Sequence, residues 1–263
     1  MRLITFLFHD VYREDPSTSG FRGPAADRYK LTVPEFEGQL RGLASARSDT
    51  PILVGDLPPS SAPGTPFVIT VDDGGESFYT TVAERLEALG WRAHCFVTTA
   101  FVGQRGFLSR EQIRGLDQRG HLIGSHSMSH PSRFSACSRG TMLREWGESR
   151  RALEDILGHD VTVASVPGGY FSPAVVASAR EAGVRVLFTS EPETRVRRVA
   201  GCIVIGRFTV RRGCRPGFTA ALANLEPVVR AREWTIWNTK KVAKGLLGVA
   251  YPRLSAKPWA WKA

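Results

Sequence analysis

The chain has 263 residues, of which 42% are hydrophobic and 23% are charged, and its formal net charge is +10. This length favours one large domain, and the composition excludes a chain that is disordered throughout. No apolar run approaches the roughly 20 residues that cross a bilayer. The positive charge lies at one end, because residues 1–194 carry a net charge of −3 and residues 195–263 carry +13. The sequence therefore predicts a near-neutral domain followed by a basic C-terminal segment.

The first 66 residues predict one strand, one helix and two loops. Residues 3–8 are an apolar run that is typical of a buried strand. Residues 10–30 are polar and rich in Gly, Pro and Ser, which predicts a long loop, and long ordered loops are often functional. Thr32 and Glu35 are start signals for a helix over residues 32–45, and residues 55–66 form a second, Pro-rich loop.

From residue 67 onward, apolar runs alternate with amphipathic segments. Strands are predicted at 67–71, 93–98, 121–124, 161–166, 184–189, 202–205 and 207–210, and helices at 78–89, 109–119, 141–157, 173–182 and 218–229. Strands that alternate with helices form right-handed βαβ units around a parallel sheet, and many such units favour a barrel over an open sheet. We therefore expect an α/β barrel over residues 1–215. A basic, Trp-rich helical extension over residues 216–263 is expected to pack on or beside it.

Two features predict a cytoplasmic protein. The apolar run at residues 3–8 is shorter than the h-region of a secretory signal, which needs about 7–15 residues. The cysteines are widely and unevenly spaced, without a C-x-x-C pair, at Cys95, Cys137, Cys202 and Cys214. We therefore expect buried free thiols in a reducing compartment.

Two groups of polar residues follow predicted strands, where parallel α/β folds gather their chemistry. Asp72 and Asp73 come directly after the strand at 67–71, and His126 and His130 follow the strand at 121–124. Two imidazoles and one carboxylate make a three-ligand set for Zn²⁺ or a similar ion, and a second carboxylate can deprotonate a metal-bound water. Alone, a D-D-G tripeptide is commonly a turn and H-x-x-x-H occurs by chance. Their joint occurrence at strand ends favours a metal-dependent hydrolase.

At these residues the sequence resembles the polysaccharide deacetylases, which share the NodB-homology domain. The T-F-D-D motif of that family is matched by T-V-D-D ending at Asp73, and its H-[ST]-x-x-H motif by His126 to His130. The resemblance covers roughly residues 1–210 and includes an F-H-D-V opening at 8–11. It implies a distorted (β/α) barrel and metal-dependent removal of an N-acyl group, usually acetyl, from an amino sugar. It also implies that Asp73, His126 and His130 bind the metal and that Asp72 is the general base.

For an Asp-His-His site, zinc is the default ion, and Co²⁺, Ni²⁺ or Mn²⁺ can also fill it. The third family motif, R-x-P, is altered here because Ser165 stands where the arginine that orients the base is expected. The motif's proline is retained, so the amide of Gly168 is a candidate oxyanion donor, with a plain tight turn as the alternative. Tyr170 is a candidate substrate-binding residue at the end of this stretch.

Two further family motifs are changed. The D-x-x-D-W motif is missing, and Glu191 stands near its place, either as a substrate-binding residue or as a solvated loop acid. The motif that ends in L-x-H has Arg207 in place of its histidine, usually the general acid. An arginine is too basic to donate its proton at neutral pH. Arg207 is therefore expected to bind substrate, to stabilise an oxyanion or to hold a carboxylate, with Glu191 as the candidate.

Another group must then protonate the leaving nitrogen. His9 follows the first predicted strand and is the leading candidate, with Asp10 to orient it. Packing of His9 under the long loop is the alternative, and Asp72 can also carry the proton itself. The other histidines, His94, His121 and His159, are expected to be structural.

Two segments outside the motifs are candidates for substrate contact. Residues 20–29 are dense in Gly, aromatic and Arg residues, and Arg22 is the candidate sugar or phosphate contact. A lid that seals the bottom of the barrel is the alternative for this loop. The C-terminal residues 230–263 hold four of the six tryptophans, interleaved with lysines. This pattern suits a helix packed on the barrel, an anionic membrane surface or a phosphate-bearing substrate. No nucleic-acid-binding module is recognisable, so no nucleic-acid partner is expected.

The leading hypothesis is a cytoplasmic, metal-dependent hydrolase of an N-acylated amino sugar, located in part at the inner face of the membrane. Its substrate is expected to be a glycan, or a lipid-linked or nucleotide-linked precursor. One alternative is a weak or inactive relative that binds glycan, because two motif residues are lost. Another is a hydrolase of a non-sugar amide on the same scaffold.

Overall fold

The computed structural model describes residues 1–59 and 63–247. At its centre lies a nine-stranded sheet in the order β11-β1-β4-β5-β6-β7-β8-β10-β9, with a separate pair of strands β2 and β3. The strands are β1 (Ile4–Phe8), β2 (Val11–Tyr12), β3 (Leu31–Thr32), β4 (Phe67–Val71), β5 (His94–Val97), β6 (Leu122–Ser125), β7 (Val163–Ser165), β8 (Val186–Phe188), β9 (Arg197–Val199), β10 (Cys202–Ile205) and β11 (Phe208–Thr209). All neighbours in the large sheet pair in parallel except β9 and β10.

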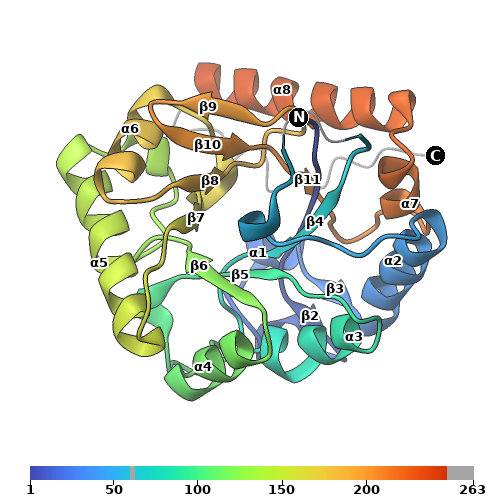
Figure 1. Ribbon diagram of the computed structural model, residues 1–263, viewed down its shortest axis with the longest axis horizontal. Helices are drawn as coiled ribbons and strands as arrows, with labels where there is room; N and C mark the ends of the chain where they lie inside the picture. Colours follow the sequence, from blue (N-terminus) through green and yellow to red (C-terminus); the bar gives the residue numbers. More distant parts are fainter. Residues whose placement is uncertain (60–62, 248–263) are drawn as a thin grey trace.

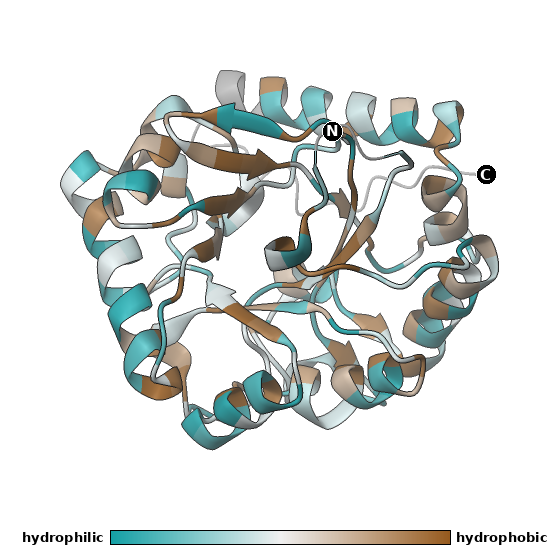
Figure 2. Ribbon diagram, viewed as in Figure 1, coloured by the Kyte–Doolittle hydropathy of each residue, from teal (hydrophilic) through white to brown (hydrophobic). Residues whose placement is uncertain are grey.

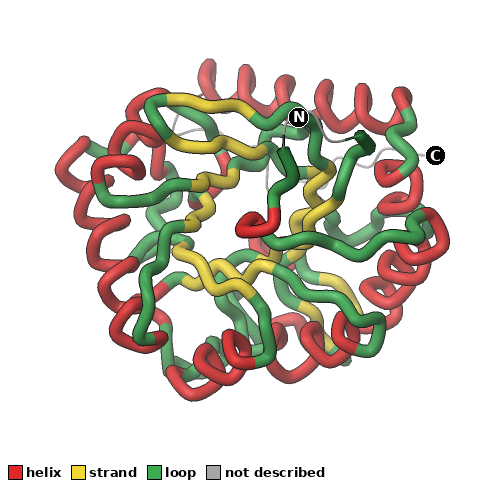
Figure 3. Tube along the Cα trace, viewed as in Figure 1, coloured by secondary structure: helices red, strands yellow, loops and turns green. Residues whose placement is uncertain are grey.

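Most helices lie outside the curled sheet and enclose it on most sides, whereas the short α1 (Pro24–Asp27) lies over the centre of the barrel in this view (Figures 1 and 3). The other helices are α2 (Val33–Ala46), α3 (Ala83–Glu87), α4 (Arg110–Gln118), α5 (Arg139–Leu157), α6 (Pro173–Glu181), α7 (Phe218–Ala223) and α8 (Pro227–Leu247). The predicted distorted (β/α) barrel is thus confirmed. Within the described residues, none of the helices has the length and hydropathy of a membrane-crossing segment.

The strands of the barrel are apolar on both faces, as expected where helices cover a parallel sheet (Figure 2). Successive side chains of a strand point to opposite faces. Phe67 and Ile69 of β4 belong to a large apolar cluster that also contains residues of α2 and α3. Val68, which lies between them, belongs to a smaller cluster with Phe96 and Phe188 of β5 and β8. The core therefore has two layers, one on each face of the sheet.

Local sequence signals explain where the helices begin. Thr32 caps α2 in a capping box, in which the Glu35 amide donates to Thr32 Oγ1 at 3.3 Å and the Thr32 amide donates to Glu35 at 2.8 Å. Ser109 forms the same reciprocal motif with Gln112 at the start of α4. At the other end of a helix, Gly158 closes α5 with a left-handed backbone, φ 78°.

The structure corrects three of the predicted elements. The predicted helix over 218–229 is two helices, because Leu225 adopts a left-handed backbone with φ 57° and Pro227 begins α8. The predicted helix over 78–89 starts as a π-helical turn before α3. The last strand shortens to β11. The four cysteines are free thiols, but Cys137 and Cys214 are only partly buried, in contrast to the prediction. Trp259 and Trp261 of the basic segment lie outside the described residues.

Because the pairing is parallel, the carboxyl ends of β1, β4, β6 and β7 meet at one end of the barrel. The residues that follow these strands include the predicted catalytic and metal-binding residues. The fold therefore brings the candidate motifs to a common place.

A buried histidine in β5 makes the stability of the fold dependent on pH. His94 Nε2 accepts a hydrogen bond from the Val54 amide at 3.1 Å, and Nδ1 lies 3.2 Å from the Ile69 carbonyl oxygen. Burial lowers the pKa of His94 to about 4. The unfolded chain, with a histidine pKa of about 6.5, takes up this proton first as the pH falls.

The contribution of His94 is therefore fully present above about pH 6.5 and is lost as the pH falls toward 4. We expect this group to remove about 2 kcal/mol of unfolding free energy between pH 7 and pH 5. Urea unfolding at both pH values, for wild type and His94→Gln, measures it. An unchanged pH dependence in His94→Gln would show that this residue is not responsible.

Candidate active site

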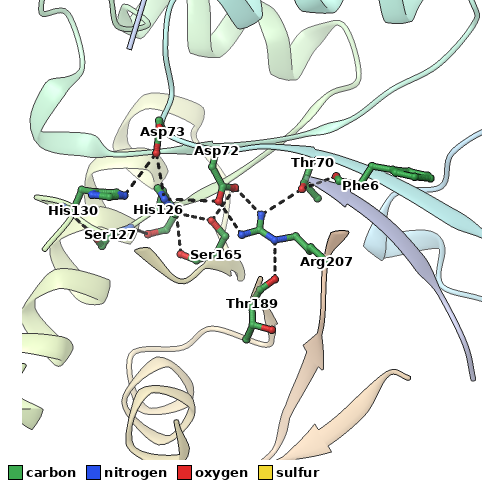
Figure 4. A network of polar contacts seen from close by, with 11 residues as sticks. Phe6, Thr70, Asp72, Asp73, His126, Ser127, His130, Ser165, Thr189 and Arg207 are labelled. Atoms are coloured by element: carbon green, nitrogen blue, oxygen red, sulfur yellow. Dashed lines mark hydrogen bonds and ion pairs between the residues drawn. The ribbon is translucent and has the colours of Figure 1, made fainter. Parts of the chain in front are cut away.

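Three side chains that the sequence predicts as metal ligands converge at the carboxyl ends of β4 and β6 (Figure 4). His126 Nε2 lies 3.4 Å from Asp73 Oδ1, and His130 Nε2 lies 3.7 Å from the same oxygen. One ligand atom from each residue lies within 4.8 Å of the others. Burial acts to raise the pKa of Asp73, but its hydrogen bond with His126 and the charges of His9 and His130 outweigh burial and lower it. Asp73 is therefore ionised at neutral pH, as a ligand needs to be.

The turn that carries the two histidines is not helical. Ser127 and His130 both have left-handed backbones, with φ 66° and 55°, a conformation that non-glycine residues adopt rarely and at a cost. Serine hydroxyls hold the turn in place: Ser127 Oγ accepts from the His130 amide at 3.1 Å, and Ser125 Oγ accepts from the Ser127 amide at 3.1 Å. The rings of His126 and His130 consequently lie 5.0 Å apart.

A buried acid on α5 anchors the same turn from outside the barrel. The Ser129 amide and hydroxyl donate to the Glu145 carboxylate at 2.8 and 2.6 Å, and the Met128 amide donates to the Glu145 carbonyl at 3.1 Å. The two serines of the H-S-x-S-H motif therefore have separate structural tasks. Ser127 supports the turn from within, and Ser129 ties it to the helix.

The His126 ring is oriented by Ser165 of β7. Its Nδ1 lies 3.1 Å from the Ser165 carbonyl oxygen and 2.5 Å from Ser165 Oγ. A neutral imidazole that donates from Nδ1 keeps its lone pair on Nε2, the atom that faces Asp73. Burial acts to lower the pKa of His126, but the carboxylates of Asp72 and Asp73 outweigh it and raise the pKa.

Asp72 and Arg207 form a bidentate ion pair beside the ligand set (Figure 4). Arg207 Nη1 and Nη2 donate to the two Asp72 carboxylate oxygens at 2.6 and 2.8 Å. Arg207 is fully buried, and its remaining donors bind the Thr189 carbonyl oxygen at 2.9 Å and Thr70 Oγ1 at 3.3 Å. Burial acts to raise the pKa of Asp72, but Arg207 and His126 outweigh it and hold the pKa below its ordinary value. Asp72 is therefore a buried carboxylate that is charged at neutral pH.

The suggested pairing of Arg207 with Glu191 is wrong. Glu191 accepts instead from Lys241 Nζ of α8 at 2.7 Å. Among the described residues, the cavity next to the ligand set is lined by Ser190 and Pro192 but not by Glu191. All three nitrogens of the Arg207 guanidinium already have protein partners, because strand β10 delivers this side chain directly toward the end of β4.

His9 lies on the wall of the same cavity, but Asp10 does not orient it. The His9 ring packs against Tyr29 with centroids 5.0 Å apart, and its Nδ1 is buried without a hydrogen-bond partner in the part of the chain that the structure describes. Asp10 points elsewhere and accepts from the hydroxyls of Ser19 at 2.6 Å and Ser77 at 2.8 Å. Burial raises the pKa of Asp10. The hydrogen bonds of Asp10 to Ser19 and Ser77 hold the loop at 10–30 against the turn after β4.

The cavity has a volume of about 410 Å³ and contains most of the predicted site residues. Its lining includes Asp72, Asp73, His126, His130, His9, Gly168, Tyr170, Arg22 and Arg207. It also includes residues that the sequence analysis did not assign to the site, namely Phe21 and Tyr29 of the long loop and Glu233, Ile236, Trp237 and Lys240 of α8. The basic helix is thus part of the cavity wall, a position that its composition alone did not indicate.

Comparisons with known proteins agree with this architecture. A family model described as polysaccharide deacetylase matches residues 60–187. A putative polysaccharide deacetylase of Bacillus subtilis, YxkH, is 25% identical over 48% of this chain and 44% of its own length. A chitooligosaccharide deacetylase of Sinorhizobium fredii is 31% identical over 50% of this chain and 60% of its own length. The chain thus spans about half the length of the curated relatives that it matches.

Solved structures share the fold at low identity. IcaB from Ammonifex degensii superposes with a TM-score of 0.66 and 22% identity, covering 85% of this chain and 96% of that one. The polysaccharide deacetylase BC0361 from Bacillus cereus gives a TM-score of 0.70 and 17% identity, covering 85% and 69%. The matched range of the family model contains the two aspartates after β4 and the two histidines after β6. On this combined evidence of motifs, fold and matching relatives, the chain belongs to the polysaccharide deacetylase family.

Proposed function

We propose that this chain is a metal-dependent amide hydrolase that removes an N-acyl group, acetyl in the first instance, from an amino sugar. The observation that carries the proposal is a charged carboxylate, Asp72, held by Arg207 next to an Asp-His-His ligand set in one cavity. The family supports a sugar substrate in a glycan or in a lipid-linked or nucleotide-linked precursor. We propose that the protein is located in the cytoplasm, in part at the inner face of the membrane.

The residues present fit a divalent metal ion. Asp73, His126 and His130 supply one carboxylate and two imidazoles, the donor set of catalytic zinc sites with open positions. The contact between His126 Nδ1 and Ser165 fixes the ring in the way that a metal-ligating histidine needs. Zn²⁺ is the expected ion, and Co²⁺, Ni²⁺ and Mn²⁺ suit the same donors. When bound, such an ion polarises the acyl carbonyl and lowers the pKa of a coordinated water.

Asp72 is placed to accept the proton of the attacking water. Arg207 uses one lone pair on each carboxylate oxygen, and Asp72 Oδ2 also lies 3.8 Å from His126 Nε2, on the side of the ligand set. The ion pair keeps Asp72 charged and fixes its orientation, although it also reduces the basicity of the carboxylate. A metal ion held by Asp73, His126 and His130 would offset this loss of basicity, because it would make the attacking water more acidic.

The remaining steps need an oxyanion donor and an acid. The backbone amide of Gly168, on the cavity wall, is the proposed donor to the developing oxyanion. Breaking the C–N bond transfers a proton to the leaving nitrogen, so that the products are an amine and a carboxylate. Asp72 can return the proton that it accepted, and His9, which also lines the cavity, is the second candidate. The structure favours Asp72, because Asp10 does not orient His9.

The arrangement of Arg207 argues against an inactive relative. Two motif residues differ from the family pattern, Ser165 and Arg207, and both contact Asp72 in this structure. An inactive protein would not be expected to keep the buried Asp72 carboxylate bound to both Ser165 and Arg207. A buried charge destabilises the fold unless it is paired. The two changes therefore act as one rearrangement around the base.

We expect one divalent ion per chain in purified wild-type protein, measured by inductively coupled plasma mass spectrometry. His126→Ala removes an imidazole ligand and is expected to lose the ion. His159→Ala is the matched control, because this exposed histidine pairs with Asp117 away from the site. Wild-type protein without stoichiometric metal would contradict the proposal.

We expect acetate or formate release from a panel of N-acylated amino sugars, assayed with added metal. Asp72→Asn removes the general base and should lower kcat by about 10²- to 10⁴-fold, the range typical of general acid–base groups. Release from non-sugar amides but from none of the sugars would favour the alternative hydrolase.

A third prediction concerns Arg207, which we expect to act through Asp72 without touching the substrate. Arg207→Lys keeps the charge but cannot make two parallel hydrogen bonds. It should therefore lower kcat about 10-fold or more and leave KM nearly unchanged. Arg150→Lys is the control, because Arg150 is a partly buried arginine of α5 that also has three protein partners. A raised KM with unchanged kcat would instead show that Arg207 binds the substrate, which is one of the roles that the sequence analysis gives it.

A further inference from the structure

A second pocket lies beside the first half of α8, outside the cavity that contains the ligand set. Its volume is about 840 Å³. Residues 192–195, which follow β8, form one wall, and residues of α8 between 227 and 234 form another. The first two residues of the chain also line it, and Figure 1 shows the N-terminus beside α8. Because Pro192 lines both the pocket and the cavity, the two spaces adjoin.

Three arginines line this second pocket, which we call the arginine pocket. They are Arg2 before β1, Arg195 before β9 and Arg230 in α8. Among the described residues, none of the three guanidinium groups forms a hydrogen bond or a salt bridge. Arginines from three separate segments of the chain thus meet at one place without an acceptor for their donors.

Two of these arginines lie directly opposite each other. Backbone hydrogen bonds on either side of the pair, at 2.8 and 3.3 Å, make Arg2 and Arg195 partners in an antiparallel bridge. Side chains at opposite positions of such a pair point to the same face, with Cβ atoms about 4.5–5.5 Å apart. Like charges at these positions destabilise the fold. An anion between them would remove this repulsion.

The acids of the chain do not neutralise the arginine pocket. Among the described residues, Glu193 is the one acid in its lining, and its carboxylate is bound at 2.8 Å to Arg197, which lies outside the lining. Burial raises the pKa of Glu193, although the charges of Arg197 and Arg195 oppose this shift. The residues outside the described ranges contain no Asp or Glu. The lining therefore carries an excess of positive charge.

We propose that the arginine pocket binds a phosphate group that carries more than one negative charge, as a diphosphate does. Guanidinium groups bind phosphate oxygens through paired, charge-assisted hydrogen bonds. One carboxylate would occupy one arginine, whereas three arginines match the several oxygens of a diphosphate. The indole of Trp234, which is 56% exposed and lines the same pocket, offers an apolar surface to the rest of the ligand.

This phosphate group belongs to a soluble ester or to a lipid headgroup, since both present the same chemistry to the arginines. The inference concerns binding alone. It therefore does not rest on the proposed hydrolysis, and a failure of that reaction leaves it intact.

Isothermal titration calorimetry of the full chain with inorganic pyrophosphate tests the proposal. Arg195→Gln and Arg230→Gln each remove one charge from the pocket. Arg232→Gln is the matched control, because it removes the same charge from an exposed position of α8 outside the pocket lining. His126→Ala shows whether pyrophosphate binds instead through a metal ion in the cavity.

We expect wild type, Arg232→Gln and His126→Ala to bind one pyrophosphate per chain with similar affinity. Arg195→Gln and Arg230→Gln should each weaken binding about 10-fold or more, the scale of a lost charge-assisted hydrogen bond. Absence of binding by wild type would overturn the proposal. Equal affinities of the three arginine variants, or loss of binding in His126→Ala, would do the same. Thermal unfolding checks that each variant is folded, and the wild-type titration does not depend on the variants.

Sedimentation with vesicles identifies the source of the phosphate group. The vesicles contain phosphatidylcholine with or without phosphatidic acid. Binding that needs phosphatidic acid, is lost in Arg230→Gln and is displaced by pyrophosphate supports the pocket and assigns a lipid headgroup to it. Pyrophosphate binding without vesicle binding supports the pocket and assigns a soluble ester.

Discussion

The buried ion pair between Asp72 and Arg207 is the interaction on which the rest of the site depends. Two charges without solvent are stable only when their geometry is good and their other hydrogen-bonding groups are satisfied. Here the guanidinium is bidentate to the carboxylate and also bonds to Thr189 and Thr70. Asp72 follows β4, and Arg207 lies in the short link between β10 and β11, two strands near opposite ends of the sheet order. The charge state of the candidate base therefore depends on correct closure of the barrel.

The pair also explains why a serine is suitable at position 165. With Arg207 already on Asp72, a second arginine from β7 would crowd the same carboxylate. The small hydroxyl of Ser165 instead bridges two groups, since its Oγ lies 3.2 Å from Asp72 and 2.5 Å from His126 Nδ1. One side chain thus links the candidate base to a candidate metal ligand. The family pattern has an arginine at position 165. Here the cation that orients Asp72 is Arg207, which follows β10.

Local patterns in the sequence predicted much of the fold and the ligand set, because strands, helix caps and strand-end motifs are properties of short segments. Asp73, His126 and His130 could be predicted in this way. The partner of Arg207 could not, because Asp72 lies 135 residues earlier and only the closed sheet brings the two together. The Asp10 contacts were missed for the same reason, since Ser77 lies 67 residues away. The helix predicted over 218–229 is interrupted at Leu225 by a left-handed backbone, which a leucine in the sequence does not predict. The position of α8 in the cavity wall follows from tertiary contacts of Glu233 and Trp237.

The central claim is that Asp72 is a base held by Arg207 beside a metal that it does not bind. A crystal structure of the zinc-loaded protein, with an anomalous difference map recorded at the zinc edge, tests this most directly. The account predicts a single peak at about 2.0–2.2 Å from one atom each of Asp73, His126 and His130. It also predicts that Asp72 stays outside the coordination sphere, still paired with Arg207. A peak coordinated by Asp72, or no peak at these residues, would contradict the account.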